Sequence, residues 1–253
     1  MVSRREILTE LEKELSCPVA AIVYHDKYEI SNGDEKYVSA FFSEFKTNNV
    51  ALILHGTGGY PPSALEMAIL LRKKFKKIIS LVPERAASAM SYIWLISNKA
   101  YFCSDTVATQ VNISFNPGTG WVLPKNNLNH PNQLIQEAAK TYFKCDYSIL
   151  ENILLMKDSI LGGELPKDAR DRSLFIENLF ESTHKKDCHT YPLTIRKLQD
   201  FHFNVERPNT RITNLLSEYV DSAKADILAN QKRSLFETKR ESIATFPTDA
   251  DFR

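Results

Sequence analysis

The segment VALILHGTGG spans residues 50–59 and joins a run of five apolar residues to a histidine and a glycine-rich turn. An apolar run of this length predicts a buried strand, and the glycines predict a turn directly after it. The pattern recurs at KIISLV (77–82), which is followed by PERAAS (83–88), and a third apolar run, AYFC, follows at 100–103. Strands that are apolar throughout and alternate with helices are typical of a parallel sheet. Both turns are therefore expected at its carboxyl edge, where open α/β proteins place their sites.

Two helices are expected between these strands. The first is predicted to begin at Ser63, because Ser63 and Glu66 have the spacing of a capping box. Its apolar stripe consists of Met67, Leu70, Leu71 and Phe75. The basic run RKKFKK (72–77) ends this helix, and we interpret it as a solvated helix end, where cations suit the dipole, and not as a nucleic-acid patch. The second helix, apolar on nearly all sides, is expected from Ala87 to about Ser97.

The flanking regions are expected to extend this arrangement into one domain spanning residues 1–253. Before the first turn we expect an N-terminal helix within 1–16, a strand at 20–25, a turn at Asn32-Gly33 and a helix at 37–46. After the third strand we expect helices within 132–160, at 169–181 and at 214–229, a short helix from about Thr194 and a small strand at 203–205. The polar tail from about residue 241 is expected to be poorly ordered. The predicted fold class is α/β, with a mostly parallel sheet of βα units and a helical C-terminal half.

Composition excludes several classes of function. The chain has 253 residues, 43% of them hydrophobic and 25% charged, and a formal net charge of +1, which gives no strong field for nucleic acid or anionic membranes. No apolar run approaches the length of about 18 residues that a membrane helix needs, and the N-terminus does not resemble a signal peptide. The cysteines, Cys17, Cys103, Cys145 and Cys188, are widely scattered, as expected for reduced thiols. A cytoplasmic protein without nucleic-acid or membrane partners is the expectation.

The residues at the two turns suggest acyl-transfer chemistry. A serine hydroxyl attacks an acyl carbon when a base accepts its proton and fixed donors stabilise the oxyanion. Ser88 lies at the start of the second helix, so the N–H of Ala89 can serve as one donor, and Gly58 or Gly59 can supply another. The alternative is that Ser88 is only a helix cap or a small packing residue. The glycines match no dinucleotide-binding or ATP-binding fingerprint, and no cofactor is expected.

Two longer segments carry a family resemblance. LILHGTGG (52–59) and LVPERAASAMSYIWLISNKAYFCS (81–104), with the helix between them, resemble the Clp protease/crotonase (ClpP/crotonase-like) superfamily. The closer similarity is to the serine dehydrogenase proteinase (SDH) family, whose members have an L-I-L-H-x-x-G-G turn and a V-P-x-x-A-x-S-A segment. HTYPLTIRKLQDFHFNV (189–205) is similar to that family's H-x-x-P-[IL]-T segment, whereas the region around 125–180 matches poorly.

The resemblance implies roles for individual residues. Ser88 would be the nucleophile, Gly58 and Ala89 would supply the oxyanion hole, and Gly59 would keep the turn open. His55 matches a family position but ends a strand, and we interpret it as a hydrogen-bonded structural histidine. The sequence departs from the family where Met90 replaces a usual glycine and Thr57 a common proline. A methionine at position 90 is expected to narrow the cleft.

The general base is left open between two residues. Clp-type peptidases have a histidine about twenty-five residues after the serine, but the segment here, VNISFNPG (111–118), contains none. Related peptidases of the superfamily use a lysine, which must be neutral to accept a proton. Lys125 in WVLPKNN and His189 in the HTYP segment are the two candidates. His184, Asp187, Cys188 and His189 fit no standard zinc spacing, so no metal is expected.

The favoured function is hydrolysis of peptide bonds by a serine peptidase, with a peptide or protein as the substrate. A catalytically inactive family member that binds or scaffolds partners is the alternative, favoured by Met90 and by the missing histidine. Acyl-thioester chemistry of the crotonase type is a third hypothesis, because those enzymes use the same paired backbone donors. The resemblance also implies a homo-oligomer, a trimer or a larger ring.

Overall fold

A seven-stranded sheet forms the centre of the molecule in the computed structural model, which describes residues 2–43, 45–103, 107–109, 127–154, 192–200 and 203–247. Its strand order is β10-β9-β1-β2-β3-β5-β8. The parallel strands are β1 (Val19–Tyr24), β2 (Asn49–His55), β3 (Lys77–Val82), β5 (Lys99–Phe102) and β8 (Val205–Glu206). The hairpin of β9 (Ser234–Thr238) and β10 (Ser242–Thr245) adds to β1 in the antiparallel sense. The expected α/β class with a mostly parallel sheet is confirmed.

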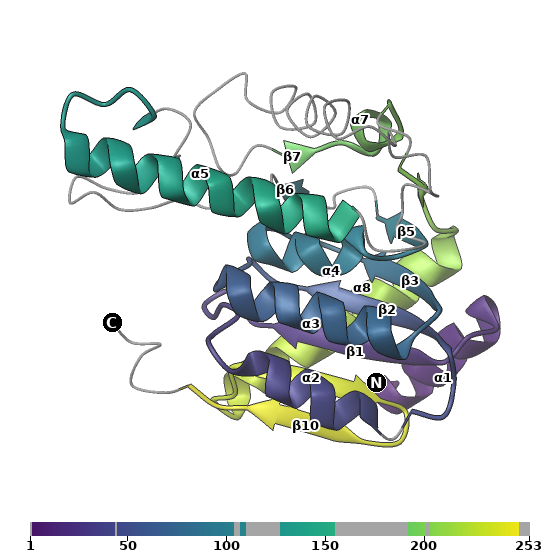
Figure 1. Cartoon of the computed structure of the whole chain (residues 1–253). Helices are drawn as coiled ribbons and strands as arrows, with labels where there is room; N and C mark the ends of the chain where they lie inside the picture. Colours follow the sequence, from purple (N-terminus) through teal and green to yellow (C-terminus); the bar gives the residue numbers. More distant parts are fainter. Residues whose placement is uncertain are drawn as a thin grey trace.

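Helices cover both faces of this sheet (Figure 1). One face carries α2 (Asp34–Ser43), α3 (Pro61–Lys74) and α4 (Ser91–Leu95), and the other carries α1 (Arg4–Leu15) and α8 (Thr210–Ala229). The long helix α5 (Gln133–Leu154) runs across α4 and α3, and α7 (Ile195–Asp200) precedes β8. A second, small sheet has the order β4 (Arg85–Ala86), β6 (Val107–Thr109) and β7 (Pro192–Leu193).

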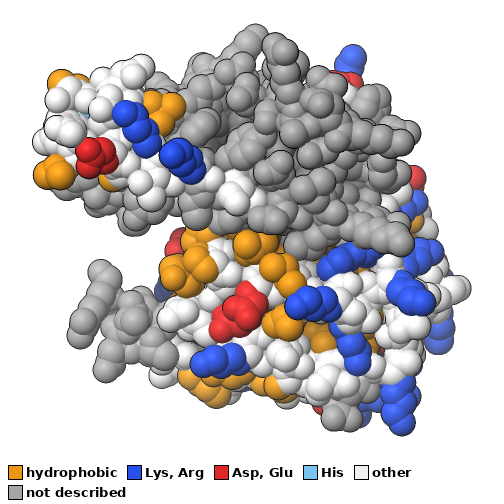
Figure 2. All heavy atoms as spheres, viewed as in Figure 1, with side chains coloured by type: hydrophobic (Ala, Val, Ile, Leu, Met, Phe, Trp, Pro, Cys, Tyr) orange, Lys and Arg blue, Asp and Glu red, His pale blue; other side chains and the backbone are white. Residues whose placement is uncertain are grey.

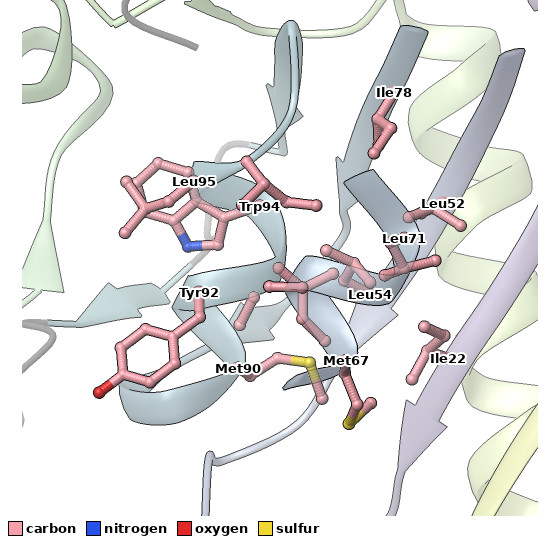
Figure 3. Close-up of a cluster of buried hydrophobic side chains, with 14 of the residues drawn as sticks. Ile22, Leu52, Leu54, Met67, Leu71, Ile78, Met90, Tyr92, Trp94 and Leu95 are labelled. Carbon is pink, nitrogen blue, oxygen red and sulfur yellow. The ribbon is translucent and has the colours of Figure 1, made fainter. Parts of the chain in front are cut away.

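Alternation along the strands divides the core into two layers. In β1, Ala20 and Ile22 pack toward α2, α3 and α4, whereas Ala21 and Val23 pack toward α1 and α8. All six residues of β1 are buried, as expected for a strand that lies inside a parallel sheet covered on both faces. Figure 3 shows part of the first layer, in which Leu52, Leu54, Met67, Leu71 and Trp94 converge between the sheet and its helices.

The start of α3 differs from the predicted capping box. The helix begins at Pro61, and its N-cap, Tyr60, makes no side-chain cap hydrogen bond. Proline sets the backbone angle that the first helical turn needs and has no N–H to satisfy there. Ser63 is instead buried within the helix, and its Oγ accepts a hydrogen bond of 3.2 Å from the N–H of Gly33. The capping-box prediction is therefore wrong, because two prolines fix the start of the helix two residues earlier.

The segment after β3 is less regular than predicted. A single helix was expected from Ala87 to about Ser97, but the chain forms a 3-10 turn, η1 (Ser88–Met90), which continues into α4 and ends at Leu95. A regular α-helix cannot begin at Ala87, because Ser88 has a φ of 49°, outside the right-handed helical region. The ends of the longer helices agree better with expectation, although α8 starts at Thr210, where Asn209 caps it by accepting from the N–H of Ile212.

The C-terminal region contains structure that the sequence did not predict. The tail from residue 241 was expected to be poorly ordered, but residues 242–245 form β10. Thr245 is buried, and its Oγ1 lies 2.6 Å from Oγ of Ser234. The prediction is corrected for residues 242–245, because pairing with β9 supplies the backbone partners that a polar tail lacks alone. The predicted helix at 169–181 lies outside the described residues. No helix in the described ranges is long and apolar enough to cross a membrane.

Candidate functional site

The turns after β2 and β3 lie side by side at the carboxyl edge of the sheet, as their order in the sequence predicted. The two strands are parallel neighbours, and the pairing continues past their ends. The N–H of Gly56 donates to the carbonyl of Arg85 at 3.0 Å, and the N–H of Ala87 donates to the carbonyl of Gly56 at 3.1 Å. These two bonds hold the glycine turn against the segment that leads into Ser88.

Gly58 is packed directly against Ser88. A β-carbon at position 58 would lie 2.5 Å from Cβ of Ser88, 3.0 Å from its Oγ and 3.0 Å from the carbonyl oxygen of Ala87. The φ angle of Gly58 is 118°, in a region that side chains rarely adopt. Glycine is therefore required here both by its backbone conformation and by the close approach of the serine.

Ser88 is partly exposed and is held in a left-handed backbone conformation. That conformation costs a non-glycine residue roughly 1–2 kcal/mol, so the surrounding contacts must stabilise it. The N-cap of η1 is Ala87, and it makes no side-chain cap hydrogen bond. Ser88 is the first residue of η1 and not its N-cap residue. The choice between a nucleophile and a cap or packing residue at position 88 stays a prediction. Strained backbone at a partly exposed residue is a feature that clusters at functional sites, so Ser88 stays the candidate nucleophile.

Two backbone N–H groups belong to residues that lie beside Ser88. The N–H of Ala89 lies in the first turn of η1, where a helix has no acceptor for its N–H groups. Within the described part of the chain, neither this N–H nor that of Gly58 donates to a backbone carbonyl. These are the two donors that the family resemblance implied for an oxyanion hole.

The far side of the glycine turn is held by the segment that follows β1. The N–H of Ile30 donates to the carbonyl of Gly58 at 2.7 Å, and the carbonyl of Ile30 accepts from the N–H of Tyr60 at 2.7 Å. A β-carbon at Gly59 would collide with the backbone of Ile30, and the φ of Gly59 is 129°. Gly59 therefore permits the close pairing that fixes Gly58. Its role of keeping the turn open for a substrate stays a prediction.

Met90 does not project into an open cleft. Its side chain is fully buried, and its Cε would lie 2.8 Å from a β-carbon at Gly56. Figure 3 shows the side chain of Met90 directed toward Met67. The expectation that this methionine narrows the cleft is wrong for the described structure, because the side chain fills the core layer under Gly56.

His55 lies on the opposite side of the sheet from η1 and has polar partners there. It is 1% exposed, its Nε2 lies 3.2 Å from Oδ1 of Asp26, and its Nδ1 lies 3.6 Å from Oε2 of Glu84. Burial lowers the pKa of the imidazole, and the charges of the two carboxylates only partly offset this. The ring nitrogens thus face Asp26 and Glu84, as expected for a hydrogen-bonded structural histidine. Sequence reasoning missed both carboxylates, although each stands two residues beyond a strand at the carboxyl edge.

Both candidate bases, Lys125 and His189, lie outside the described residues, as do His184, Asp187 and Cys188. Their predicted roles stay predictions. Within the described ranges, no group of three or more His, Cys, Asp or Glu side chains is arranged to hold a metal ion.

Basic side chains gather away from the glycine turn. Figure 2 shows Lys and Arg side chains concentrated along one side of the face that α2 and α3 cover. The last turn of α3 contributes Arg72, Lys73 and Lys74. Arg72 donates to Oδ1 of Asn98 at 3.0 Å, and Lys74 donates to the carbonyl of Ser43 at 3.2 Å. These contacts are consistent with the interpretation of the basic run as a solvated helix end.

The comparisons with known proteins give similarity to solved structures only. No family model matches the chain, and no curated protein matches it. Among solved structures, the chain is similar to a ClpP1 mutant from Listeria monocytogenes, with 12% sequence identity and a TM-score of 0.47, over 80% of this chain and 99% of that chain. The resemblance to the serine dehydrogenase proteinase family stays a prediction.

Proposed function

We propose that this chain is a serine-type hydrolase that cleaves peptide bonds through an acyl-enzyme on Ser88. The observation that carries the proposal is the contact between the two turns. Ser88 is strained and partly exposed, and its side chain lies against the backbone of Gly58. A buried packing serine has no need of a left-handed conformation, whereas a nucleophile that must project from a turn does.

The geometry is compatible with a two-step reaction. A base accepts the hydroxyl proton as Oγ of Ser88 bonds to the peptide carbonyl carbon, and the carbonyl oxygen becomes an oxyanion held by the N–H groups of Gly58 and Ala89. The carbon–nitrogen bond then breaks, and the leaving amine takes the proton from the base. Water, deprotonated by the same base, hydrolyses the ester and frees Ser88. Lys125 and His189 are the two candidates for the base.

Labelling with a fluorophosphonate probe tests the nucleophile. The folded protein should be labelled at Ser88, and Ser88→Ala should abolish labelling with little change in the thermal midpoint, because alanine has the same β-carbon in the same strained conformation. Ser91→Ala is the matched control. Ser91 is buried and donates to the carbonyl of Ala86 at 2.9 Å, so this variant should keep labelling but lose about 1 kcal/mol of stability.

The same labelling assay identifies the general base, and it can also contradict the hydrolase proposal. Lys125→Ala and His189→Ala are compared with the unmodified chain, and loss of the true base should lower the labelling rate about 100-fold or more. A well-folded protein that remains unlabelled from pH 6 to 10 would contradict the proposal. The alternative of a catalytically inactive protein that binds or scaffolds partners would then be favoured.

We further propose that the chain assembles into a homo-oligomer, a trimer or a larger ring. The support for this is the family resemblance of residues 50–104 alone. Light scattering at micromolar concentration measures the mass directly. A strict monomer of 28.9 kDa would contradict the assembly and would leave the proposal for Ser88 unaffected.

A further inference from the structure

Four side chains form a closed ring of polar contacts beneath the two turns. Nε2 of His55 contacts Oδ1 of Asp26 at 3.2 Å, and Nδ1 of His55 faces Oε2 of Glu84 at 3.6 Å. Nζ of Lys224 closes the ring, at 2.9 Å from Oε2 of Glu84 and 3.3 Å from Oδ2 of Asp26. We call these four residues the His55 ring. It connects the ends of β1, β2 and β3 to α8, so three neighbouring strands are held at the edge that carries the site.

The His55 ring contains the first of three successive contacts, or links, between the segment at residues 55–58, at the end of β2, and the segment at residues 84–88, after β3. The first link is the approach of His55 to Glu84. The second is the backbone bridge of Gly56 to the segment around Ala86, made by the two hydrogen bonds described above. The third is the contact of Gly58 with Ser88. Because the links follow one another along the two segments, we expect a change in the first to alter the spacing at the third.

The contacts of His55 depend on its protonation. The neutral imidazole can donate Nε2–H to Asp26, which leaves the Nδ1 lone pair facing a carboxylate oxygen of Glu84. Among the described residues Nδ1 has no hydrogen-bond partner. A proton on Nδ1 would become a donor to Glu84 and would draw the two segments together. The charged groups that face His55 are Asp26 after β1, Glu84 after β3 and Lys224 on α8.

We propose that His55 is a positioning residue of the Ser88 site, which acts through Glu84 to set the spacing between the glycine turn and the serine turn. In its neutral form His55 bonds to Asp26 and leaves Glu84 paired with Lys224, and this arrangement gives the spacing that the oxyanion donors need. A proton at Nδ1 shortens the first link and disturbs the third. The catalytic consequence rests on the proposed hydrolase function, but the structural consequence does not.

The catalytic arm compares two variants by their rate of fluorophosphonate labelling. His55→Gln keeps a neutral donor and cannot gain a proton, so its rate at pH 8 should be within about threefold of the unmodified chain. His55→Leu removes the donor and should be at least about tenfold slower, which is the effect of losing one hydrogen bond to a charged group. As pH falls from 8 to 5.5, the unmodified chain should slow relative to His55→Gln. The ratio of the two rates cancels the titration of the general base, which both chains share.

The structural arm uses amide hydrogen exchange and needs no activity. The amides of Gly56 and Ala87 report on the second link directly. Their protection should fall about tenfold in His55→Leu and be retained in His55→Gln. Amides in the middle of β2 should stay protected in both variants, which separates loosening of the turns from general loss of stability.

The two arms fail in different ways. If Ser88 is not labelled in the unmodified chain, the hydrolase proposal is contradicted. Hydrogen exchange alone then tests whether His55 positions the two turns. If Gly56 and Ala87 keep full protection in His55→Leu, or if the middle of β2 loses protection equally, the positioning role is overturned. Equal pH dependence of labelling in the unmodified chain and in His55→Gln would overturn the role of the proton.

Discussion

Gly58 and Gly33 both have positive φ angles, 118° and 95°, but only Gly58 lacks room for a β-carbon. Nothing lies within 4 Å of the position that a β-carbon would take at Gly33, whereas the same atom at Gly58 meets Ser88. An alanine at Gly33 would lose stability only through its backbone conformation, whereas an alanine at Gly58 would also lose stability through steric overlap with Ser88. The pair gives a direct test of how close the two turns must be.

We expect Gly33→Ala to lose about 1–2 kcal/mol of unfolding free energy, the cost of an alanine in the left-handed region, and to keep labelling at Ser88. Gly58→Ala should lose a further 1–3 kcal/mol or so from overpacking. It should also label about 100-fold more slowly, because the turn that carries an oxyanion donor must move away. Urea unfolding and probe labelling measure the two effects. Equal labelling in the two variants would show that Gly58 is not part of the site.

Elements close in the sequence could be predicted, because apolar runs and the turns after them are local signals. The strands β2 and β3, and the meeting of their turns, follow from the segments 50–59 and 77–88 alone. The His55 ring could not be predicted, since Lys224 is 140 residues from Glu84 and no local pattern joins them. The shortened helix after β3 was missed for a different reason: helix periodicity does not report the positive φ of Ser88 or its contact with Gly58, which is distant in the sequence.

A buried ion pair connects the C-terminal hairpin to the helical layer. Arg233, just before β9, forms a two-pronged contact with Asp34 at the start of α2, and both side chains are almost fully buried. Asp34 also accepts from the hydroxyl of Tyr24 and the N–H of Ser31, each at 2.8 Å. Arg233 in turn donates to the carbonyl of Glu29, next to the segment that supports the glycine turn.

Breaking this pair should be far more costly than breaking an exposed one. Arg233→Met leaves the Asp34 carboxylate buried without its cation, and we expect a loss of about 3–5 kcal/mol in urea unfolding. Arg211→Met is the control, because the pair of Arg211 with Glu10 is largely exposed, with side-chain exposures of 62% and 35%. That variant should lose at most about 1 kcal/mol. Similar losses in the two variants would contradict a structural role for the buried pair.

For the molecule as a whole, acid should weaken the fold in two separate pH windows. Burial lowers the pKa of His55 from its ordinary value of 6.5, so its neutral form contributes stability above pH 6.5 that is lost as pH falls toward the folded value. Burial raises the pKa of Asp226, but hydrogen bonds from Lys232 and Arg4 outweigh it, so the pKa lies below 3.8. Its contribution is present above pH 3.8 and is lost as pH falls through the lower, folded value.

We expect the thermal midpoint to decrease in a first step below pH 6.5 and in a second step below pH 4. His55→Gln should remove the first step and keep the second, since glutamine does not titrate. Calorimetry from pH 3 to 8 on both chains measures this. A first step that persists in His55→Gln would assign it to another group.

The antiparallel pairing of β9 with β1 also has a consequence for synthesis on the ribosome. The partners Tyr24 and Ser234 are 210 residues apart (234 − 24), and Ala20 and Thr238 are 218 apart (238 − 20). At translation rates of about 5–20 residues per second, β1 leaves the ribosome roughly 10–40 s before its outer neighbour exists. During that interval one edge of a wholly apolar strand has unsatisfied backbone groups, which is the type of surface that pairs with other chains. That edge of β1 can therefore pair with other chains until β9 has been synthesised and covers it.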